Sequence, residues 1–279
     1  MSAITVFGAG AWGSTLAQVL CDAGNDVLLW GRNVETIGEI NSSHTNERYL
    51  AGQVLPSTLR ATTDLDEAFA FSQVYVLAIP STQLRTTLNE WKTRFSADCT
   101  IVSTLKGIEV STMLRMTEII EEILGKHKIA LLTGPNLADE LILRQPAGAV
   151  AASTSLAVAE QVRELFRTPY YRVYTSVDLQ GCELAGAIKN VIALAVGISI
   201  GMGYGENTQA MLITRGLNEV ARLCAAHGSD PLTAAGLAGM GDLVATCGSP
   251  LSRNRTFGEL LGKTGSMEMA IAQGAKTVE

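Results

Sequence analysis

Short runs of apolar and β-branched residues alternate with helix-like segments over the first half of the chain. Between several of these runs the apolar residues recur with helical spacing, as in TMLRMTEIIEEILG at residues 112–125. Strands that alternate with helices predict a parallel sheet covered on both faces, which is a doubly wound α/β fold. We predict strands at residues 4–8, 26–31, 74–80, 99–107, 128–136, 148–153 and 171–177.

The pattern changes after residue 177, where long segments rich in Ala, Gly and Leu replace the β-branched runs. This change predicts two domains, a sheet domain at residues 1–178 and an all-helical domain at residues 179–279. The first long segment of the second domain, CELAGAIKNVIALAVGISIG at 182–201, is apolar except at a few positions.

Lys189 and Asn190 interrupt the middle of that segment. On a helix, the residues three, four and seven positions from Lys189 are all apolar or glycine, so its ammonium has no polar neighbour there. A buried ammonium normally loses its proton or finds a counter-charge. Alternatively, the lysine stem lies along the core while its charged end reaches water.

Composition limits the class of protein. A chain of 279 residues with 47% hydrophobic and 17% charged residues is globular and long enough for two domains. A net charge of −6 without a basic run argues against nucleic-acid binding. The segment around Lys189 has the length of a membrane span, but Glu183, Lys189 and Asn190 disfavour that interpretation.

The cysteines and histidines form no recognisable framework. Five scattered cysteines without a CxxC pair and three distant histidines disfavour a disulfide frame and a metal site. The N-terminus MSAITVFGAG has no basic stretch followed by an apolar one, so we expect no signal peptide. We therefore expect a reduced, soluble, cytoplasmic protein without a metal ion.

A glycine loop follows the first predicted strand. FGAGAWGSTLA places Gly8, Gly10 and Gly13 in G-x-G-x-x-G spacing at the start of a helix. These glycines permit a tight turn, close approach to a pyrophosphate and close packing of helix on strand. The amides around Ala11 and Trp12 then face a bound anion. The bare spacing also occurs in structural turns, but this placement predicts dinucleotide binding.

The second predicted strand ends in LLWGRN, with Arg32 where NAD-binding sites usually carry an acidic residue. A carboxylate there would repel a 2′-phosphate, whereas Arg32 can pair with it. The sequence therefore favours NADP(H), with NAD(H) possible as the second choice. The alternative is that Arg32 is only a solvated surface residue.

Two further segments lie where strands are predicted to end, the edge at which open parallel sheets bind ligands. Lys106 lies in STLKGIE, and Gly134, Pro135 and Asn136 form a turn in LLTGPNLADE. Either segment is also typical of an ordinary turn that joins a strand to a helix.

The second half contains two polar clusters. In GLAGMGDLVATC, Asp242 and Thr246 share one helical face, and Asp242 is a candidate counter-charge for Lys189 or simply a helix cap. An arginine fork with hydroxyl and amide donors suits a phosphate monoester, although a solvated loop looks similar. This second cluster comprises Ser252, Arg253, Asn254 and Arg255.

Five motifs stand in one order along the whole chain: GAGAWG, LKGIE, TGPNLADE, GAIKN and GMGDLVATC followed by SRNRTFG. Together they resemble NAD(P)-dependent glycerol-3-phosphate dehydrogenase of the bacterial type that supplies phospholipid synthesis. The resemblance implies a Rossmann domain followed by an all-helical substrate domain, a homodimer, and reduction of dihydroxyacetone phosphate to sn-glycerol 3-phosphate.

The resemblance also implies roles for individual residues. Lys189 corresponds to the catalytic lysine, which stabilises charge on the ketone oxygen and delivers the proton. Its catalytic companions are Asn190, Asp242 and Thr246, and Lys106 corresponds to a second lysine that reaches substrate and nicotinamide. Substrate positions are Lys106, Gly134, Asn136, Lys189, Asp242, Ser252, Arg253 and Asn254. Cofactor positions are Gly8, Gly10, Ala11, Trp12, Gly13, Arg32, Lys106, Ala138, Arg253 and Glu279.

The chain departs from the family pattern at two places. Thr133 stands where the family motif more often has Ser, and the sequence ends in KTVE, inside the family's late V-E-G motif. The resemblance therefore implies that the family's final helices are lacking here. Two rival hypotheses remain, a related β-hydroxyacid or 6-phosphogluconate-type dehydrogenase and a non-catalytic cofactor-sensing protein.

Overall fold

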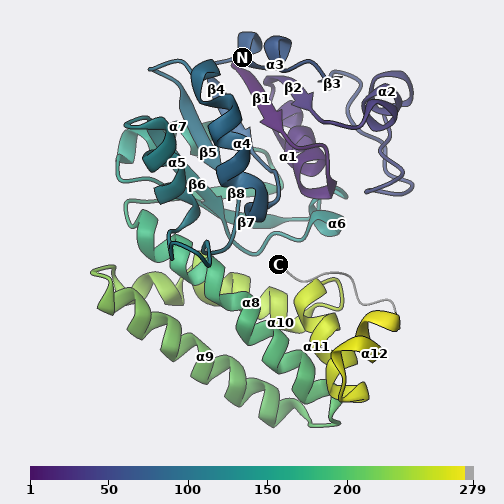
Figure 1. Cartoon of the computed structure of the whole chain (residues 1–279), viewed down its shortest axis with the longest axis vertical. Coiled ribbons are helices and arrows are strands. Elements are labelled where there is room, and N and C mark those ends of the chain that lie inside the picture. Colours follow the sequence, from purple (N-terminus) through teal and green to yellow (C-terminus); the bar gives the residue numbers. More distant parts are fainter. Residues whose placement is uncertain (274–279) are drawn as a thin grey trace. The chain divides into compact units, whose positions relative to one another are not determined.

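The computed structural model describes residues 1–273, and these divide into two compact units (Figure 1). The first unit comprises Met1–Leu132 and Ala138–Leu179, and the second comprises Thr133–Leu137 and the chain from Gln180 onward. The predicted boundary after residue 178 lies one residue from the main division. The short segment Thr133–Leu137 differs, because the prediction assigned it to the first domain.

The first unit is built on one eight-stranded sheet in the order β3-β2-β1-β4-β5-β6-β7-β8. Neighbouring strands pair in parallel in the pairs β1–β2, β2–β3, β1–β4, β4–β5, β5–β6 and β7–β8. The predicted α/β architecture is therefore confirmed. The strands are β1 Ala3–Phe7, β2 Asp26–Trp30, β3 Arg60–Thr62, β4 Val74–Leu77, β5 Thr100–Ser103, β6 Lys128–Thr133, β7 Ala147–Ala152 and β8 Tyr171–Ser176.

Strand β3 is not among the predicted strands. It has only three residues, of which Arg60 is exposed, so it contains no run of apolar residues. Its place beside β2 comes from backbone pairing, with Leu28 opposite Arg60 and Trp30 opposite Thr62. The edge of a sheet tolerates such a short polar strand, and a pattern of hydrophobic residues does not reveal it.

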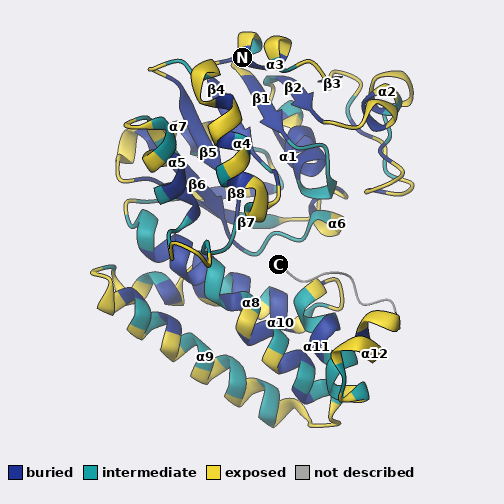
Figure 2. Cartoon of the chain, in the orientation of Figure 1, coloured by how far each residue is buried: buried dark blue, intermediate teal, exposed yellow. Residues whose placement is uncertain are grey.

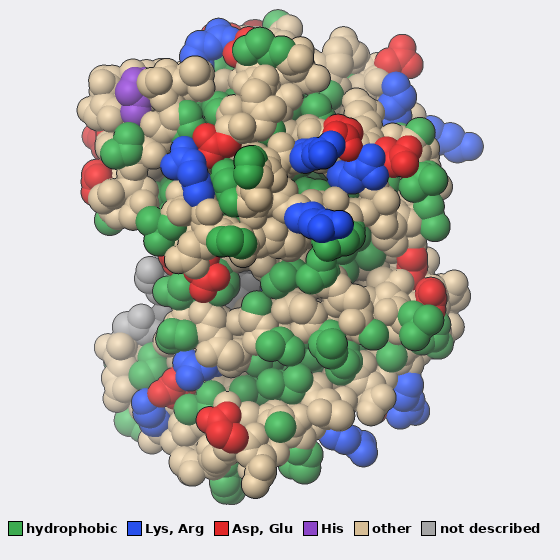
Figure 3. Space-filling view, turned by 180° about the vertical axis from the view of Figure 1, so that it is seen from behind, with side chains coloured by type: hydrophobic (Ala, Val, Ile, Leu, Met, Phe, Trp, Pro, Cys, Tyr) green, Lys and Arg blue, Asp and Glu red, His purple; other side chains and the backbone are tan. Residues whose placement is uncertain are grey.

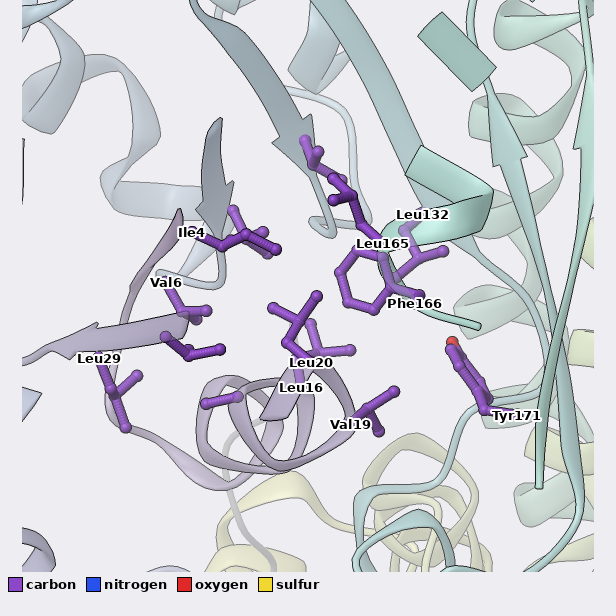
Figure 4. Packing of buried hydrophobic residues seen from close by; sticks show 14 of the residues in the cluster. Ile4, Val6, Leu16, Val19, Leu20, Leu29, Leu132, Leu165, Phe166 and Tyr171 are labelled. Carbon is purple, nitrogen blue, oxygen red and sulfur yellow. The ribbon is translucent and has the colours of Figure 1, made fainter. Parts of the chain in front are cut away.

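Side chains of successive strand residues enter two different cores. In β1, Ile4 and Val6 belong to one core while Phe7 belongs to the other. In the first core, Leu16 and Leu20 of α1 (Ala11–Asp22) point toward these β1 side chains (Figure 4). The second core is aromatic, and its Phe7 and Trp91 rings lie 4.9 Å apart. Each fully buried side chain of this kind contributes roughly 1.5–3 kcal/mol, so both faces stabilise the sheet.

The remaining helices of the first unit connect the strands. Buried and exposed residues alternate along several of them, such as α4 (Figure 2). They are α2 Val34–Ser43, α3 Leu65–Phe71, α4 Leu84–Trp91, α5 Met116–Leu124, α6 Ala138–Leu141 and α7 Leu156–Leu165.

The described part of the second unit is helical apart from its Thr133–Leu137 segment and the connecting turns. Glycines let α8 and α11 approach closely, because a Cβ on Gly197 of α8 would lie 2.1 Å from the Arg255 carbonyl oxygen. A Cβ on Gly258 of α11 would lie 2.2 Å from the Leu194 carbonyl oxygen. The helices are α8 Leu179–Gly201, α9 Glu206–Ala226, α10 Asp242–Gly248, α11 Arg253–Thr264 and α12 Met267–Ala272.

Helix α8 is long and apolar enough to cross a membrane by length and composition alone, with a mean hydropathy of 1.8. The central helix of a soluble domain meets the same criteria. Buried Glu183 and Lys189 and the glycine contacts with α11 are features of such a central helix. Exposed apolar side chains do occur on the second unit, including Val191 and Met211, and Figure 3 shows hydrophobic groups gathered on one face.

Candidate active site

Lys189 lies in the interior of the second unit with two polar partners. Its Nζ donates to Oδ1 of Asp242 and, at 2.8 Å, to Oγ1 of Thr246. The three residues are 7%, 1% and 6% exposed, so the ion pair is almost completely removed from solvent. Asp242 is therefore the counter-charge that the apolar surroundings of Lys189 predicted, and the lysine end does not simply reach water.

An unusual turn precedes Asp242 and sets its direction. A π-helical turn at Leu237–Gly241 ends immediately before α10, and the Gly241 N–H donates to the Gly236 carbonyl at 3.1 Å. A Cβ on Gly239 would lie 2.1 Å from the Ala234 carbonyl oxygen, so the turn requires glycine there. One turn into α10, the Thr246 hydroxyl donates to the Asp242 carbonyl at 2.6 Å. The predicted common face of Asp242 and Thr246 is thus present.

Cys247 lies beside this cluster on α10 but is not a reactive thiol. Burial raises its pKa to about 11, although the nearby Lys189 ammonium acts in the opposite direction. Because the thiolate is the nucleophile, a thiol with this pKa remains protonated and unreactive near neutral pH.

The segment Thr133–Leu137 brings polar groups to the same unit. It runs beside the turn before α10, since a Cβ on Gly241 would lie 3.7 Å from the Pro135 ring. Gly134 has a φ of +140°, a conformation that favours glycine. The side-chain O and N of Asn136 and the Thr133 hydroxyl are buried without a hydrogen-bond partner among the described residues. Because such groups cost about 1–3 kcal/mol each, they favour a polar ligand here.

The predicted phosphate-binding residues begin α11. Ser252 caps this helix, because its hydroxyl accepts the Arg255 N–H at 3.3 Å. Arg253 is exposed and Asn254 is half-buried in the first turn, which contains no acidic residue. A helix N-terminus with these side chains favours an anion. Arg255 pairs with Glu259 at 3.1 Å, and its Nε is buried without a hydrogen-bond partner within residues 1–273.

In the glycine loop of the first unit, two glycines are required by close backbone packing, whereas the third leaves open space. A Cβ on Gly8, whose φ is +121°, would lie 2.4 Å from the Ala78 carbonyl oxygen. A Cβ on Gly13 would lie 1.8 Å from the Gly8 carbonyl oxygen. A Cβ on Gly10, the N-cap residue before α1, would meet no atom of the described residues within 4 Å. The fold therefore explains Gly8 and Gly13, whereas open space beside Gly10 fits an approaching ligand.

Other predicted cofactor residues surround the carboxyl ends of the parallel strands. Ala11 and Trp12 form the first turn of α1, and Trp12 packs partly against the core. Arg32 is exposed two residues after β2, and its Nη2 donates to Oε1 of Gln83 at 3.2 Å. Lys106 is half-buried three residues after β5, and Ala138 begins α6.

The predicted site residues thus fall into both units. Asn190 is half-buried beside Lys189 on α8. Glu279 lies outside the described residues. The first unit holds Gly8, Gly10, Ala11, Trp12, Gly13, Arg32, Lys106 and Ala138, and the second holds Gly134, Asn136, Lys189, Asn190, Asp242, Thr246, Ser252, Arg253 and Asn254.

Asn46 is not among the predicted site residues, yet it supports the glycine loop. This fully buried amide donates to the Ala9 carbonyl at 3.1 Å and to the Ser14 hydroxyl at 2.9 Å. The contacts join residues 37 and 32 positions apart, so no local spacing reveals them. The sequence therefore gives no sign of this role, because the burial of the amide is a property of the folded chain.

A glycine loop at the carboxyl edge of a parallel sheet, with a separate helical unit holding a buried lysine cluster, defines a two-domain nicotinamide-dependent dehydrogenase. Comparison with known proteins identifies the group within this class. Residues 3–159 match the NAD-dependent glycerol-3-phosphate dehydrogenase N-terminus, and residues 178–279 match the C-terminus of the same family. The chain belongs to the NAD-dependent glycerol-3-phosphate dehydrogenase family.

Individual relatives agree with this assignment. The chain is 51% identical over 282 residues to glycerol-3-phosphate dehydrogenase (NAD(P)+) of Thermobifida fusca, covering 100% of this chain and 84% of that protein. The corresponding protein of Corynebacterium diphtheriae is 52% identical over 271 residues, covering 96% and 82%.

Solved structures lead to the same family. The crystal structure of glycerol-3-phosphate dehydrogenase from Coxiella burnetii is 34% identical, with a TM-score of 0.92 over 99% of this chain and 85% of that one. D-mandelate dehydrogenase is 15% identical with a TM-score of 0.55, so that likeness shows the fold alone. The resemblance inferred from the five motifs is confirmed, and the rival hydroxyacid dehydrogenase assignment is not supported.

Proposed function

We propose that this protein catalyses the reduction of dihydroxyacetone phosphate to sn-glycerol 3-phosphate with NADPH or NADH, and the reverse reaction. The observation that carries the proposal is the buried Lys189–Asp242–Thr246 cluster in a chain of the glycerol-3-phosphate dehydrogenase family. In this proposal the first unit binds the dinucleotide and the second binds the substrate.

Lys189 would act on the ketone oxygen. When bound, the nicotinamide cofactor supplies the hydride that reduces the ketone carbon. Negative charge then develops on the oxygen, where the Lys189 ammonium stabilises it and delivers a proton. Asp242 favours the charged form of Lys189, and Thr246 fixes the direction of its Nζ. In the reverse reaction neutral Lys189 is the base, and Asn190 helps to orient substrate or lysine.

The substrate phosphate would lie at the N-terminus of α11. Arg253 and Asn254 supply donors from the first turn, while Ser252 fixes that turn by capping it. Asn136 and Gly134 would contact the hydroxyl-bearing end of the substrate, since the Asn136 amide is buried without a hydrogen-bond partner in the described part of the chain. Holding both ends of the substrate fixes the carbonyl for reaction, which is a large part of catalysis.

The cofactor would bind along the carboxyl edge of the first unit. The pyrophosphate would approach Gly10 and the amides of Ala11 and Trp12, and Arg32 would pair with a 2′-phosphate. We therefore favour NADP(H), with NAD(H) as the second cofactor. Further cofactor contacts are proposed for Lys106, Ala138, Arg253 and Glu279.

The deciding experiment measures oxidation of NADPH and NADH by the purified chain. Dihydroxyacetone phosphate should support turnover, while 3-oxo acids and other oxo forms of hydroxyacids should not. Turnover only with the oxo acids would favour a β-hydroxyacid-type enzyme. Cofactor binding without turnover on any substrate would favour a cofactor-sensing protein.

The family resemblance and the proposed product also suggest a biological setting. We propose that the enzyme is cytoplasmic, functions as a homodimer, and supplies sn-glycerol 3-phosphate for glycerophospholipid synthesis. Size-exclusion chromatography with light scattering tests the dimer, and a single protomer mass at micromolar concentration would contradict it.

A further inference from the structure

The loop that carries Lys106 is long and irregular. It joins β5 to α5 over residues 104–115, and it turns at Gly107, whose φ is +142°. Within the loop, Ile108 and Arg115 form an isolated bridge and the Glu109 N–H donates to the Leu114 carbonyl at 2.9 Å. These bonds close the second half of the loop on itself. The start of the loop is fixed to β4, because the Thr104 hydroxyl donates to the Leu77 carbonyl at 2.8 Å.

Arg85 of α4 supplies an attachment through Glu109. Its Nε lies 2.9 and 3.0 Å from the two Glu109 carboxylate oxygens, and its Nη2 lies 2.9 Å from Oε2. On its other side, Nη1 lies 2.8 Å from Oε1 of Glu122 on α5. One guanidinium therefore joins the loop to two helices, with the planar geometry that lysine cannot reproduce.

Several features distinguish this network from an ordinary surface ion pair. Arg85 and Glu109 are 29% and 20% exposed at their side chains, whereas Arg60 and Asp26 elsewhere in the unit are 55% and 41% exposed. Glu109 also accepts the Thr112 hydroxyl at 2.5 Å. Arg85 and Thr112 together hold the pKa of Glu109 below its usual range. Networked, partly desolvated pairs constrain side chains more than isolated exposed ones do.

The geometry points to a new role: we propose that Arg85 is a positioning residue, which fixes the Lys106 loop through Glu109 and uses Glu122 as a second anchor. The inference rests on the proposed function, in which Lys106 contacts the cofactor. Thr104 fixes the chain before Lys106. Glu109 lies three residues after Lys106 with Gly107 between them, so the Arg85 pair fixes the chain on the other side of the lysine. Small displacements of a reacting group reduce rates by up to about a hundredfold.

The test is a double-mutant cycle between Arg85 and Lys106. Arg85→Met should lower kcat/KM for dihydroxyacetone phosphate by roughly tenfold or more, and Glu109→Gln should lower it similarly. In a Lys106→Gln background, the same Arg85→Met change should lower the residual kcat/KM by less than about twofold, because the lysine that it positions is gone. Arg85→Lys should restore only part of the loss, since one ammonium cannot reproduce the fork.

The control is Arg60→Met, which removes the exposed pair with Asp26 and should leave kcat/KM unchanged. Equal losses from Arg85→Met in both backgrounds, or no loss in the native background, would overturn the proposal.

Hydrogen exchange of the amides of residues 104–110 provides a second measurement that does not depend on turnover. It should accelerate in Arg85→Met and not in Arg60→Met, and unchanged exchange would also overturn the proposal. Absence of turnover in the native chain would instead contradict the proposed function.

Discussion

The two units prepare their ligand sites by different physical means. In the second unit, the side chains of Lys189, Asp242 and Thr246 bury a charge and its counter-charge in a helical interior. In the first unit, the glycine loop offers backbone amides and open space beside Gly10. The proposed reacting group therefore depends on a side-chain network, whereas the proposed cofactor site depends on the absence of side chains.

Removing the lysine should give the largest effect. Lys189→Ala deletes the group that we propose stabilises charge on the oxygen and supplies the proton, so kcat should fall by about 10²–10⁴-fold. NADPH binding, measured by fluorescence titration, should remain within about twofold because the glycine loop is untouched. Near-native turnover would show that the buried cluster is not the reacting centre.

Removing the counter-charge should affect stability as well as turnover. Asp242→Asn leaves the Lys189 ammonium buried without its carboxylate, which should cost about 3–5 kcal/mol in the free energy of unfolding. Thr246→Val removes a neutral hydroxyl from the same ammonium and should cost only about 1–2 kcal/mol. Urea denaturation of both variants provides the measurement. Equal losses would mean that the charge itself contributes little.

Arg32 tests how the first unit selects its cofactor. Arg32→Ala should weaken NADPH binding by about 1.5–3 kcal/mol, because the 2′-phosphate loses a charge-assisted bond. NADH binding should hardly change. Titration of both cofactors gives the answer, and a parallel loss for NADH would place Arg32 at the shared part of the dinucleotide or in the fold.

Substitutions at two glycines of the same loop test cofactor binding and fold stability separately. Gly10→Ala adds a methyl group to open space, so the ligand-free protein should keep its Tm while NADPH binding weakens by about 1–2 kcal/mol. Gly8→Ala places a Cβ 2.4 Å from the Ala78 carbonyl oxygen at positive φ. That variant should already be less stable without ligand, by about 1–3 kcal/mol. An unchanged NADPH affinity in Gly10→Ala would contradict the proposed approach of the pyrophosphate.

The smallest predicted effect concerns the pH dependence of the Arg85 network. Arg85 and Thr112 lower the pKa of Glu109 from its ordinary value of 4.5 in the folded state. A lowered folded pKa means that the contribution is present above pH 4.5 and is lost as pH falls through the folded pKa. The stability difference between the native chain and Glu109→Gln should therefore shrink in acid. A difference that grows below pH 4 would contradict the pairing.

The alternation of hydrophobic residues predicted most of the sheet because buried parallel strands need near-continuous apolar runs. It could not predict β3, because this three-residue strand contains no run of apolar side chains. Nor could it assign Thr133–Leu137 to the second unit. This segment continues directly from β6 and packs within the second unit, but no change in composition marks the transition.

Charge in an apolar environment was the most informative sequence signal for the candidate site. A buried lysine among glycines, alanines and isoleucines requires a counter-charge. Asp242, which is 53 residues later in the sequence, provides it. Asn46 and Arg85 gave no such signal. Asn46 lies in a polar loop and Arg85 on a polar helix face, so only the folded chain shows what each one holds.

The most direct test of the account is a single turnover with enzyme and NADPH in excess over dihydroxyacetone phosphate. The native chain should convert the added ketone to sn-glycerol 3-phosphate with loss of one equivalent of NADPH per substrate molecule. Lys189→Ala, shown by titration to bind NADPH, should complete the same conversion at least about a hundredfold more slowly. Equal rates in the two proteins, or no conversion by the native chain, would contradict the claim that buried Lys189 drives this reaction.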